Sequence, residues 1–379
     1  MTAVVDGRTA AALRDHAAGL RERLGLAEAP ILSATGLWLL LGAVAEAVEE
    51  PADRAALEAV LGVPAGDATA AVTALLADPH PAVGAALGGW VRPDLSLLRP
   101  VPGPVPVGPL PGQPALDAWA REHTRGLIRA FPLRADPRML LLLASALVTE
   151  PRWRERLATD RDGRLLLEDG LQAVVATEAA GPVGVAGPPT DDGIDVLSVI
   201  AAPDLPAADV WRAVDEVVSR RLGGTLAPGS RPSGPLGDGH AWRVTEGVES
   251  FVAWQAPEEG AELWTSRLPA WHAEARHELT AAPGVAEAGR GLAGLLPPEA
   301  LADGLDLRCV QAATATYDAD GFRAAAVTAL GIRAAGMPSY VDRRVRRVVL
   351  TFDRPHALVA VARGGAWEGM PLFHAWVRP

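Results

Sequence analysis

The side chains that most often perform catalysis or bind metals are few in this sequence, and their spacing suits neither task. His272 and His277, in "WHAEARHEL", lie five residues apart, which places them on different faces of a helix or a strand, so we expect no shared metal ion. The segment "ILSATG", which contains Ser33, comes nearest to a nucleophile elbow but lacks its first glycine. There is no phosphate-binding loop, no dinucleotide fingerprint and no H-E-x-x-H. The sequence therefore predicts no metal site, no cofactor and no enzyme.

One stretch has a pattern that could act by changing its structure. In "YDADGFRAAAVTALGIRAAG", residues 317–336, the side chains after Gly321 separate by parity. One face would carry Phe322, Ala324, Ala326, Thr328, Leu330, Ile332 and Ala334. The other face would carry Arg323, Ala325, Val327, Ala329, Gly331, Arg333 and Ala335. Such alternation is typical of a half-buried strand, yet alanine is a poor strand former, so the stretch can form a strand without strongly preferring one.

Composition and charge describe a globular chain with an acidic surface. The 379 residues are 49% hydrophobic and 21% charged, which suits a folded domain better than a disordered one. All 35 positive charges are arginine, and the net charge of −11 argues against general nucleic-acid binding. The single cysteine, Cys309, excludes an internal disulfide framework, and its apolar neighbours indicate a small buried side chain.

Two segments bear on localisation. The N-terminal segment carries acidic residues early and has no uninterrupted apolar core, so it does not resemble a secretory signal. The most apolar run, "APILSATGLWLLLGAVAEAV", is interrupted by Ser33 and Thr35 and is short for a membrane span. We therefore expect a cytoplasmic chain without a membrane segment, unless a leader has been removed.

The elements that would position a site mix helices and strands without a strict βαβ rhythm, which predicts an α+β fold. Apolar spacing predicts helices over residues 8–27, 36–49 and 53–62, and a further helix in "ALDAWAREHTRGLIRAF". Residues 138–148, "RMLLLLASALV", are predicted to form a central strand buried on both faces. "RRVVLTF" and "ALVAVAR" read as short strands near the C-terminus. Because no repeat or linker occurs, we expect one domain over residues 1–379.

Six segments in a fixed order resemble the serpin family. "ILSATGLWLLLGAVAEAV" resembles the family's buried helix, which is entered by a serine-rich strand end. "LDAWAREHTRGLI" resembles the family's Asn-x-Trp helix, with Asp117 in place of the asparagine. "LLLLASALVTEPRW", which ends at Trp153, resembles the family's central strand. "WTSRLPAWHAEARHEL", "VQAATATYDADGFRAAAVTAL" and "LTFDRPHALVAVARGGAWEGMPLFHAWVRP" resemble the later strands and the hinge of the reactive loop.

The resemblance implies a fold of about eight or nine helices around three mainly antiparallel sheets, with an exposed reactive-centre loop at about residues 319–347. It also implies a mechanism: a protease cleaves the loop, the loop inserts into the central sheet as a new strand, and the protease is trapped as an acyl-enzyme. Small residues would lower the steric cost of insertion. The hinge would comprise Gly321, Phe322, Arg323, Ala324, Ala325, Ala326 and Thr328.

Several positions depart from the family's pattern. Phe322 stands where the family has a small hydroxyl residue, and overpacking costs about 1–3 kcal/mol. Ala319 replaces a hinge glutamate. In the shutter and breach, which would include Ser33, Ser145, Trp153 and Gln311, Gln311 replaces a histidine and Ser145 replaces an asparagine. The two replacements could share a hydrogen bond.

The bait residue has two assignments. Counting forward from Gly321 places the scissile bond at Ala335–Gly336, which would suit an elastase-like or subtilisin-like protease. Counting back from Pro355 places it near Arg343 or Arg344, which would suit a trypsin-like protease because its pocket carboxylate pairs with guanidinium. We prefer Ala335. Another interpretation of "RRVRR" is a strand edge whose charges deter edge-to-edge pairing.

Three functions remain open, the third being an enzyme on this scaffold, which would need a pocket of converging polar groups. The first is a monomeric serpin-type inhibitor that acts on a serine protease as a suicide pseudo-substrate. The second is a non-inhibitory binding, carrier or accessory protein on the same fold, towards which Phe322 and the altered shutter point.

Overall fold

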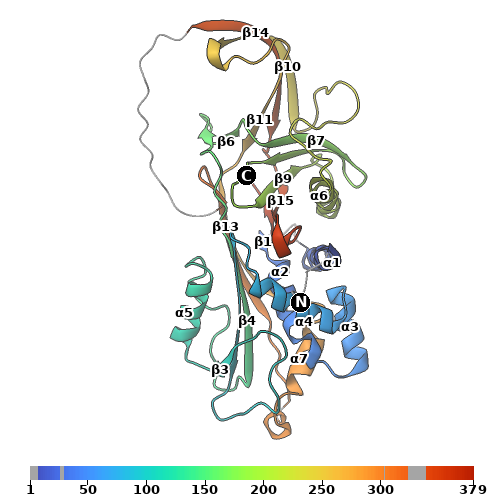
Figure 1. The fold of residues 1–379 in the computed structure, drawn as a ribbon, viewed down its shortest axis with the longest axis vertical. Helices are drawn as coiled ribbons and strands as arrows, with labels where there is room; N and C mark the ends of the chain where they lie inside the picture. The colour runs from blue at the N-terminus through green and yellow to red at the C-terminus, as the bar shows by residue number, and fades with distance from the viewer. Residues whose placement is uncertain (1–6, 26–29, 303, 323–338) are drawn as a thin grey trace.

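The computed structural model describes residues 7–25, 30–302, 304–322 and 339–379 (Figure 1). The residues proposed as bait, Ala335 and Gly336, and the hinge residues from Arg323 onward lie outside the described residues. The architecture is α+β, as predicted, and its long axis runs from a helical end to a long β ladder at the opposite end. In the described residues there are seven α-helices, against the eight or nine expected, and four short 3₁₀ helices.

Most α-helices lie at the end of the molecule opposite the long β ladder, and the first and the sixth lie near its middle (Figure 1). The α-helices are α1 (Gly7–Leu24), α2 (Ala34–Val44), α3 (Pro51–Leu61), α4 (Ala65–Ala77), α5 (Gln113–His123), α6 (Ala207–Leu222) and α7 (Val285–Ala293). The 3₁₀ helices are η1 (Ala45–Ala47), η2 (Ala253–Gln255), η3 (Pro298–Leu301) and η4 (Gly365–Trp367). Helices α2, α3, α4 and α7 gather at one end, with α2 fully enclosed, whereas α6 covers a face of the largest sheet (Figure 1).

Two sheets build the part of the molecule that carries the C-terminus. The six-stranded sheet has the order β1 (Ile31–Leu32), β16 (Pro371–Val377), β15 (His356–Ala362), β9 (Ile194–Ile200), β8 (Gly181–Gly187) and β7 (Leu171–Thr177). The five-stranded sheet has the order β10 (Trp242–Val252), β14 (Tyr340–Thr351), β11 (Glu262–Leu268), β6 (Leu165–Leu167) and β5 (Ala158–Thr159). All ladders in both sheets are antiparallel except the parallel pairing of β11 with β14.

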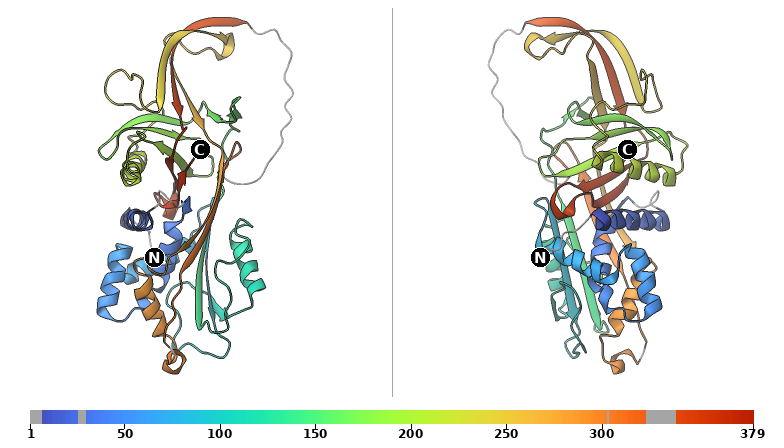
Figure 2. Two further views of the ribbon diagram at one scale, coloured as in Figure 1. Left: turned by 180° about the vertical axis from the view of Figure 1, so that it is seen from behind. Right: turned by 45° about the vertical axis from the view of Figure 1, so that its right-hand side comes forward.

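The remaining long strands form two separate half-sheets where one sheet was expected. Three strands have the order β3 (Val107–Pro109), β2 (Val83–Val91) and β4 (Leu141–Thr149). Two more, β12 (Trp271–Glu278) and β13 (Val310–Tyr317), pair with each other over eight positions. In the described chain no ladder joins β4 to β13, so the expected third sheet is divided in two. Figure 2 shows the two half-sheets running along the same side of the molecule and converging near the ends of β4 and β13.

Two local predictions were wrong. The strand expected to be buried on both faces, β4, buries alternate residues, because its second face carries less tightly covered side chains such as Leu143 and Leu147. The helix expected to run on from Leu116 ends at His123, because Arg125 and Gly126 adopt left-handed backbone angles (φ of 51° and 84°) that no α-helix contains.

A buried charge network joins the first helix to the largest sheet. Arg21 of α1 is 4% exposed and donates to both carboxylate oxygens of Asp215 on α6, at 2.8 and 2.5 Å. Its second amino group lies 2.8 Å from Nε2 of His374 on β16, and its guanidinium stands 5.1 Å from the Trp211 ring centroid. Burial and the neighbouring Arg21 charge hold the pKa of His374 well below its usual value, so its Nε2 accepts the bond.

No single helix of the described residues is long and apolar enough to cross a membrane. The bent pair α3 and α4 reaches the required length and apolarity only when the two helices are counted together.

We predict that His356 makes the fold sensitive to acid. Complete burial lowers its pKa from 6.5 to about 4, so the unfolded chain takes up the proton first as pH falls. The stabilisation is present above pH 6.5 and is lost between pH 6.5 and about 4. At pH 4.5 the loss is about 2–3 kcal/mol. Urea unfolding at pH 7.5 and 4.5 should show a smaller pH difference in His356→Gln than in the native chain. The exposed His272→Gln is the control, and equal effects of the two substitutions would contradict the prediction.

Candidate functional site

The chain reverses direction directly after β13. Backbone N–H of Asp318 donates to the carbonyl of Gly321 at 3.0 Å, which closes a hairpin-like turn over residues 318–321. The Asp318 carboxylate accepts from the N–H groups of Asp320 and Gly321, at 2.8 and 3.1 Å. This Asx arrangement satisfies the turn's own donors, so the turn is fixed by its local sequence "DADG".

After the turn, the first described residues pair with the segment that follows β4. Gly321 forms an antiparallel bridge with Arg152, and N–H of Phe322 donates to the Pro151 carbonyl at 3.0 Å. N–H of Trp153 donates to the Asp320 carbonyl at 3.1 Å, and its indole N–H to the Asp318 carbonyl at 2.9 Å. A Cβ at position 321 would lie 2.5 Å from the Pro151 carbonyl oxygen, so this close pairing requires glycine.

Four aromatic rings pack around this turn. Trp153 lies 5.1 Å from Tyr317, Tyr317 stacks on Trp271 at 6.1 Å, and Trp271 meets the edge of Phe322 at 6.1 Å (centroid distances). Phe322 is only 3% exposed, so the ring is enclosed in this conformation, whereas the overpacking expected from its size concerns the inserted loop and stays a prediction. Complete burial raises the pKa of the Tyr317 hydroxyl far above its usual value. Trp271 and Tyr317 were missed in the sequence, although both stand at ends of predicted strands.

Below the turn, the first residues of α2 contact both half-sheets. Ser145 on β4 donates to the Gly36 carbonyl at 2.6 Å. Gln311 on β13 accepts from N–H of Ser33 at 3.0 Å and donates to its carbonyl at 2.8 Å. Both side chains reach Gly36, because a Cβ placed there would be 3.6 Å from the Gln311 amide nitrogen and 3.7 Å from the Ser145 hydroxyl. Both strands therefore contact the same turn of α2, and within the described residues each is the terminal strand of its half-sheet.

The bond suggested between Ser145 and Gln311 does not occur. Each residue instead bonds the backbone at the α2 N-terminus: Ser145 bonds one carbonyl, and Gln311 bonds both the N–H and the carbonyl of Ser33. Ser33 is the N-cap of α2, accepts from N–H of Gly36 at 3.2 Å and donates to the Leu372 carbonyl on β16 at 2.8 Å. The four residues predicted for the shutter and breach therefore lie in different elements. Ser33 caps α2, Ser145 and Gln311 lie on the two half-sheets, and Trp153 follows β4 and bonds the turn.

The alternative bait residues lie inside a sheet. Arg343 and Arg344 belong to β14, opposite Glu249 and Val248 of β10. On the other side of β14, the Arg344 carbonyl accepts from N–H of Gly260 at 2.8 Å. The interpretation of "RRVRR" as a strand is confirmed, but its placement at a sheet edge was wrong, because β10 and residues 259–261 flank it. The edge belongs to β10, a strand that we had not predicted.

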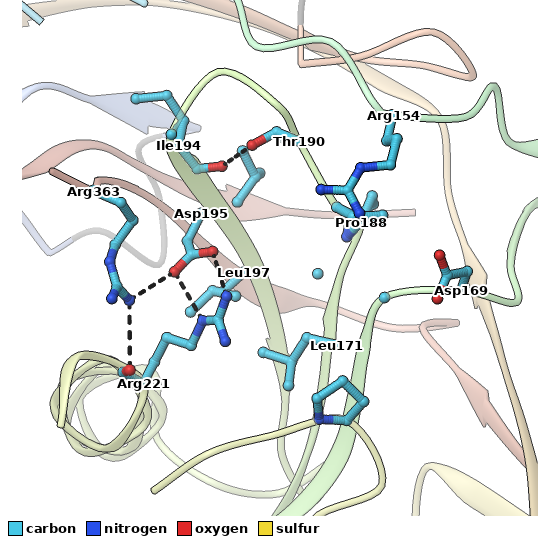
Figure 3. A pocket seen from close by; sticks show the side chains of 16 residues that line it. Arg154, Asp169, Leu171, Pro188, Thr190, Ile194, Asp195, Leu197, Arg221 and Arg363 are labelled. Carbon is cyan, nitrogen blue, oxygen red and sulfur yellow. Dashed lines mark hydrogen bonds and ion pairs between the residues drawn. The ribbon is translucent and has the colours of Figure 1, made fainter. Parts of the chain in front are cut away.

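A cavity of about 470 Å³ opens near the turn at residues 318–321, among β7, β8, β9, α6 and the end of β15 (Figure 3). Asp195 holds one wall together by accepting from Arg221 at 2.9 and 3.0 Å and from Arg363 at 3.2 Å. Arg154 and Asp169 stand on the opposite side, and Leu171 and Leu197 supply apolar surface between them. The cavity is tied to the turn, because N–H of Arg154 donates to the Pro189 carbonyl and the preceding residue, Trp153, holds Asp318. No spacing in the sequence indicated this group of residues.

Solved structures similar to this one cover nearly the whole chain. Thyroxine-binding globulin in complex with thyroxine is 12% identical, with a TM-score of 0.65 over 98% of each chain. Serpin48 of the insect Tenebrio molitor is 13% identical, with a TM-score of 0.61 over 98% of each chain. The thermophilic serpin Tengpin in its native state is 13% identical, with a TM-score of 0.61 over 96% of this chain and 93% of that one. No protein-family model and no curated protein sequence matches the chain.

We predict that Gln311 stabilises the junction between β13 and α2. Gln311→Ala would leave both peptide groups of Ser33 without their side-chain partner and is expected to lower the free energy of unfolding by about 1–3 kcal/mol. Urea denaturation measures the change. Gln255→Ala, a substitution at an exposed glutamine, should change stability by less than about 0.5 kcal/mol. Equal stability of Gln311→Ala and the native chain would show that the contact contributes nothing.

Proposed function

We propose that this chain, which has the serpin fold, inhibits a serine protease by inserting its cleaved loop between β4 and β13. The observation that supports the proposal is the path of the chain at residues 318–322. The chain has already turned back towards the junction of the half-sheets, and Gly321 and Phe322 pair antiparallel with Pro151 and Arg152. A strand continuing from Phe322 in this direction would run along β4.

The energetic argument rests on the unpaired edges. In the described residues, β4 has a ladder only with β2, and β13 only with β12. A strand inserted between them would gain hydrogen bonds on both sides and would cover apolar surface beside α2. The intact loop is anchored at both ends and cannot insert fully, so cleavage would release the stored free energy in one step. The protease attached to the cleaved end would be carried along.

The pairing of β14 favours one scissile bond over the other. Cleavage near Arg343 or Arg344 would require a protease to remove these residues from a ladder bonded on both sides. Ala335–Gly336 precedes that ladder. We therefore retain Ala335 as the bait, with an elastase-like or subtilisin-like serine protease as the partner, because such enzymes accept a small side chain.

A thermal melt before and after nicking the loop tests the mechanism. We expect the nicked chain to melt tens of degrees higher than the intact chain, because insertion adds a central strand. Mass spectrometry locates the cut, and a complex with elastase or subtilisin that survives SDS would identify the inhibited class. Coincident melts of the nicked and intact chains would rule out the insertion.

Two matched substitutions use the parity of the loop sequence. Ala326 falls on the face expected to turn inward and Ala325 on the face expected to turn outward. Ala326→Glu should abolish the rise in melting temperature, because insertion would bury an unpaired carboxylate. Ala325→Glu should retain most of the rise. The same response from both variants would contradict strand insertion even if nicking raised the melting temperature.

A second candidate function, small-molecule binding, is favoured by the cavity beside the turn. Its volume of about 470 Å³ lies within the range of small-ligand sites. Arg221 uses Nε and Nη2 for Asp195, whereas its Nη1 donates no hydrogen bond within the described residues, which leaves a donor for a ligand carboxylate. The exposed guanidinium of Arg154, whose Nε donates to Asp191 at 2.8 Å, stands across the cavity (Figure 3).

Calorimetric titration with 1-naphthoate and with neutral 1-naphthamide tests this candidate. We expect 1-naphthoate to bind at least about tenfold more tightly, equivalent to about 1.4 kcal/mol. Arg154→Ala should remove most of that difference, whereas the neighbouring Arg152→Ala, which lies outside the cavity lining, should not. Absence of binding, or equal binding of the acid and the amide, would exclude a carboxylate carrier.

A further inference from the structure

Strand β10 leaves a long edge of the five-stranded sheet unpaired. It is the terminal strand in the order β10, β14, β11, β6 and β5, and its ladder with β14 extends over eleven positions. In Figures 1 and 2 this ladder rises beyond the body of the molecule. A long exposed edge presents peptide groups that can pair with another strand.

Hydrogen bonds on both sides of β10 show which of its peptide groups point away from β14. The Ala241 carbonyl accepts from Thr351, and N–H of Ala253 donates to Ser339, so odd-numbered residues of β10 bond β14. The peptide groups of even-numbered residues must therefore point away from β14. Two hydrogen bonds agree with this: the Trp242 carbonyl accepts from Gly239, and N–H of Val244 donates to Asp238. Beyond these, the outward peptide groups of Glu246, Val248 and Ser250 have no partner in the described part of the chain.

Beyond the free segment, the ladder of β10 and β14 has no third strand in the described residues. Strand β11 pairs with β14 only from Arg346 to Thr351, and Gly260 bonds Arg344, so residues 340–343 and 249–252 form a two-stranded ribbon. A two-stranded ribbon alone is marginally stable in water. The side chains of Val248, Trp254 and Tyr340, all on or next to this ribbon, are 62%, 78% and 62% exposed. Exposed apolar residues on an unpaired edge indicate a surface that is covered by a partner.

We propose that two copies of this chain pair through their β10 edges, antiparallel about Val248. The free segment 246–250 is symmetrical about Val248, so this register places Val248 opposite its own copy and Glu246 opposite Ser250 of the partner subunit. Every outward peptide group of the segment then finds a partner. Two five-stranded sheets become one continuous sheet with a two-fold axis, an interface type common among homodimers.

The charges on β10 are compatible with a second copy of this chain pairing along its edge. In this register Glu246 faces a serine and Glu249 faces a glycine, so no like charges stand directly opposite each other. Both carboxylates are already neutralised within their own chain: Glu246 lies 3.2 Å from Arg346, and Glu249 lies 2.7 Å from Arg347. A register centred on Glu246 would oppose two carboxylates and would also require N–H of Val244, which Asp238 occupies. The dimer replaces the monomer expected from the sequence and does not depend on the proposed inhibition.

Sedimentation velocity of the full chain from about 1 to 100 µM tests the dimer. Val248→Pro removes one outward N–H without touching the bonds to β14, which is the position where an edge strand tolerates proline. Val248→Lys places two cations against each other at the two-fold axis. Each should weaken the dimer at least about tenfold, while Leu98→Lys, at an equally exposed apolar residue elsewhere (63%), should not. A chain that is monomeric throughout, or a dimer insensitive to both Val248 variants, would overturn the proposal.

Cysteine cross-linking tests the register and does not depend on how the Val248 variants fold. In a Cys309→Ala background, Val248→Cys should form an intermolecular disulfide, because paired Cα atoms about 5.5 Å apart are within bonding reach. Glu246→Cys and Ser250→Cys should each cross-link poorly alone and efficiently when mixed. Leu98→Cys reports random collision. Cross-linking of Val248→Cys no faster than that of Leu98→Cys would contradict the interface.

Discussion

The rest of this structure depends on two strand edges, on β4 and β13, that face each other without pairing. Unpaired peptide groups in a folded protein are costly unless water or side chains satisfy them. Here both strands contact the N-terminal turn of α2, where Ser145 bonds one backbone group and Gln311 bonds two. These bonds fix the position of each half-sheet relative to α2 without joining the half-sheets to each other.

The turn at residues 318–321 brings the chain that follows β13 back to the junction of the two half-sheets. It is built from local bonds of Asp318 and is anchored to the segment after β4 by Trp153 and Gly321. The chain that leaves it is therefore directed towards the junction of the half-sheets. Phe322 fills this position with an aromatic ring that packs on Trp271. A small hydroxyl side chain could not make that contact, so the departure from the family pattern has a packing role at the turn.

The six-stranded sheet is almost completely buried and is tied to two helices. In the six-stranded sheet, β15 is buried at every position and β9 at all but one, and the sheet is fastened to α1 and α6 by the pairing of Arg21 with Asp215 and His374. Burial disfavours the charged forms of both partners, raising the pKa of Asp215 and lowering that of Arg21, but the close two-oxygen contact with Arg21 favours the ionised pair.

Sequence patterns alone determined the class of fold and the places where most long elements occur. Apolar spacing located α1 to α3 to within a few residues, because helical periodicity is set by local geometry. The order of six family-like segments indicated the fold, which the solved structures confirm at 12–13% identity. The parity of residues 322–334 was readable for the same local reason, although Arg323 and its successors lie outside the described residues.

Tertiary structure decided what depends on contacts between distant segments. Ser145 and Gln311 could be named from the sequence, but their partners could not, since those are peptide groups of α2 more than a hundred residues away. The burial of Phe322 depended on Trp271, and the position of Arg344 inside a sheet depended on β10. A residue's type limits which bonds it can make, whereas the folded chain determines which groups come within reach of them.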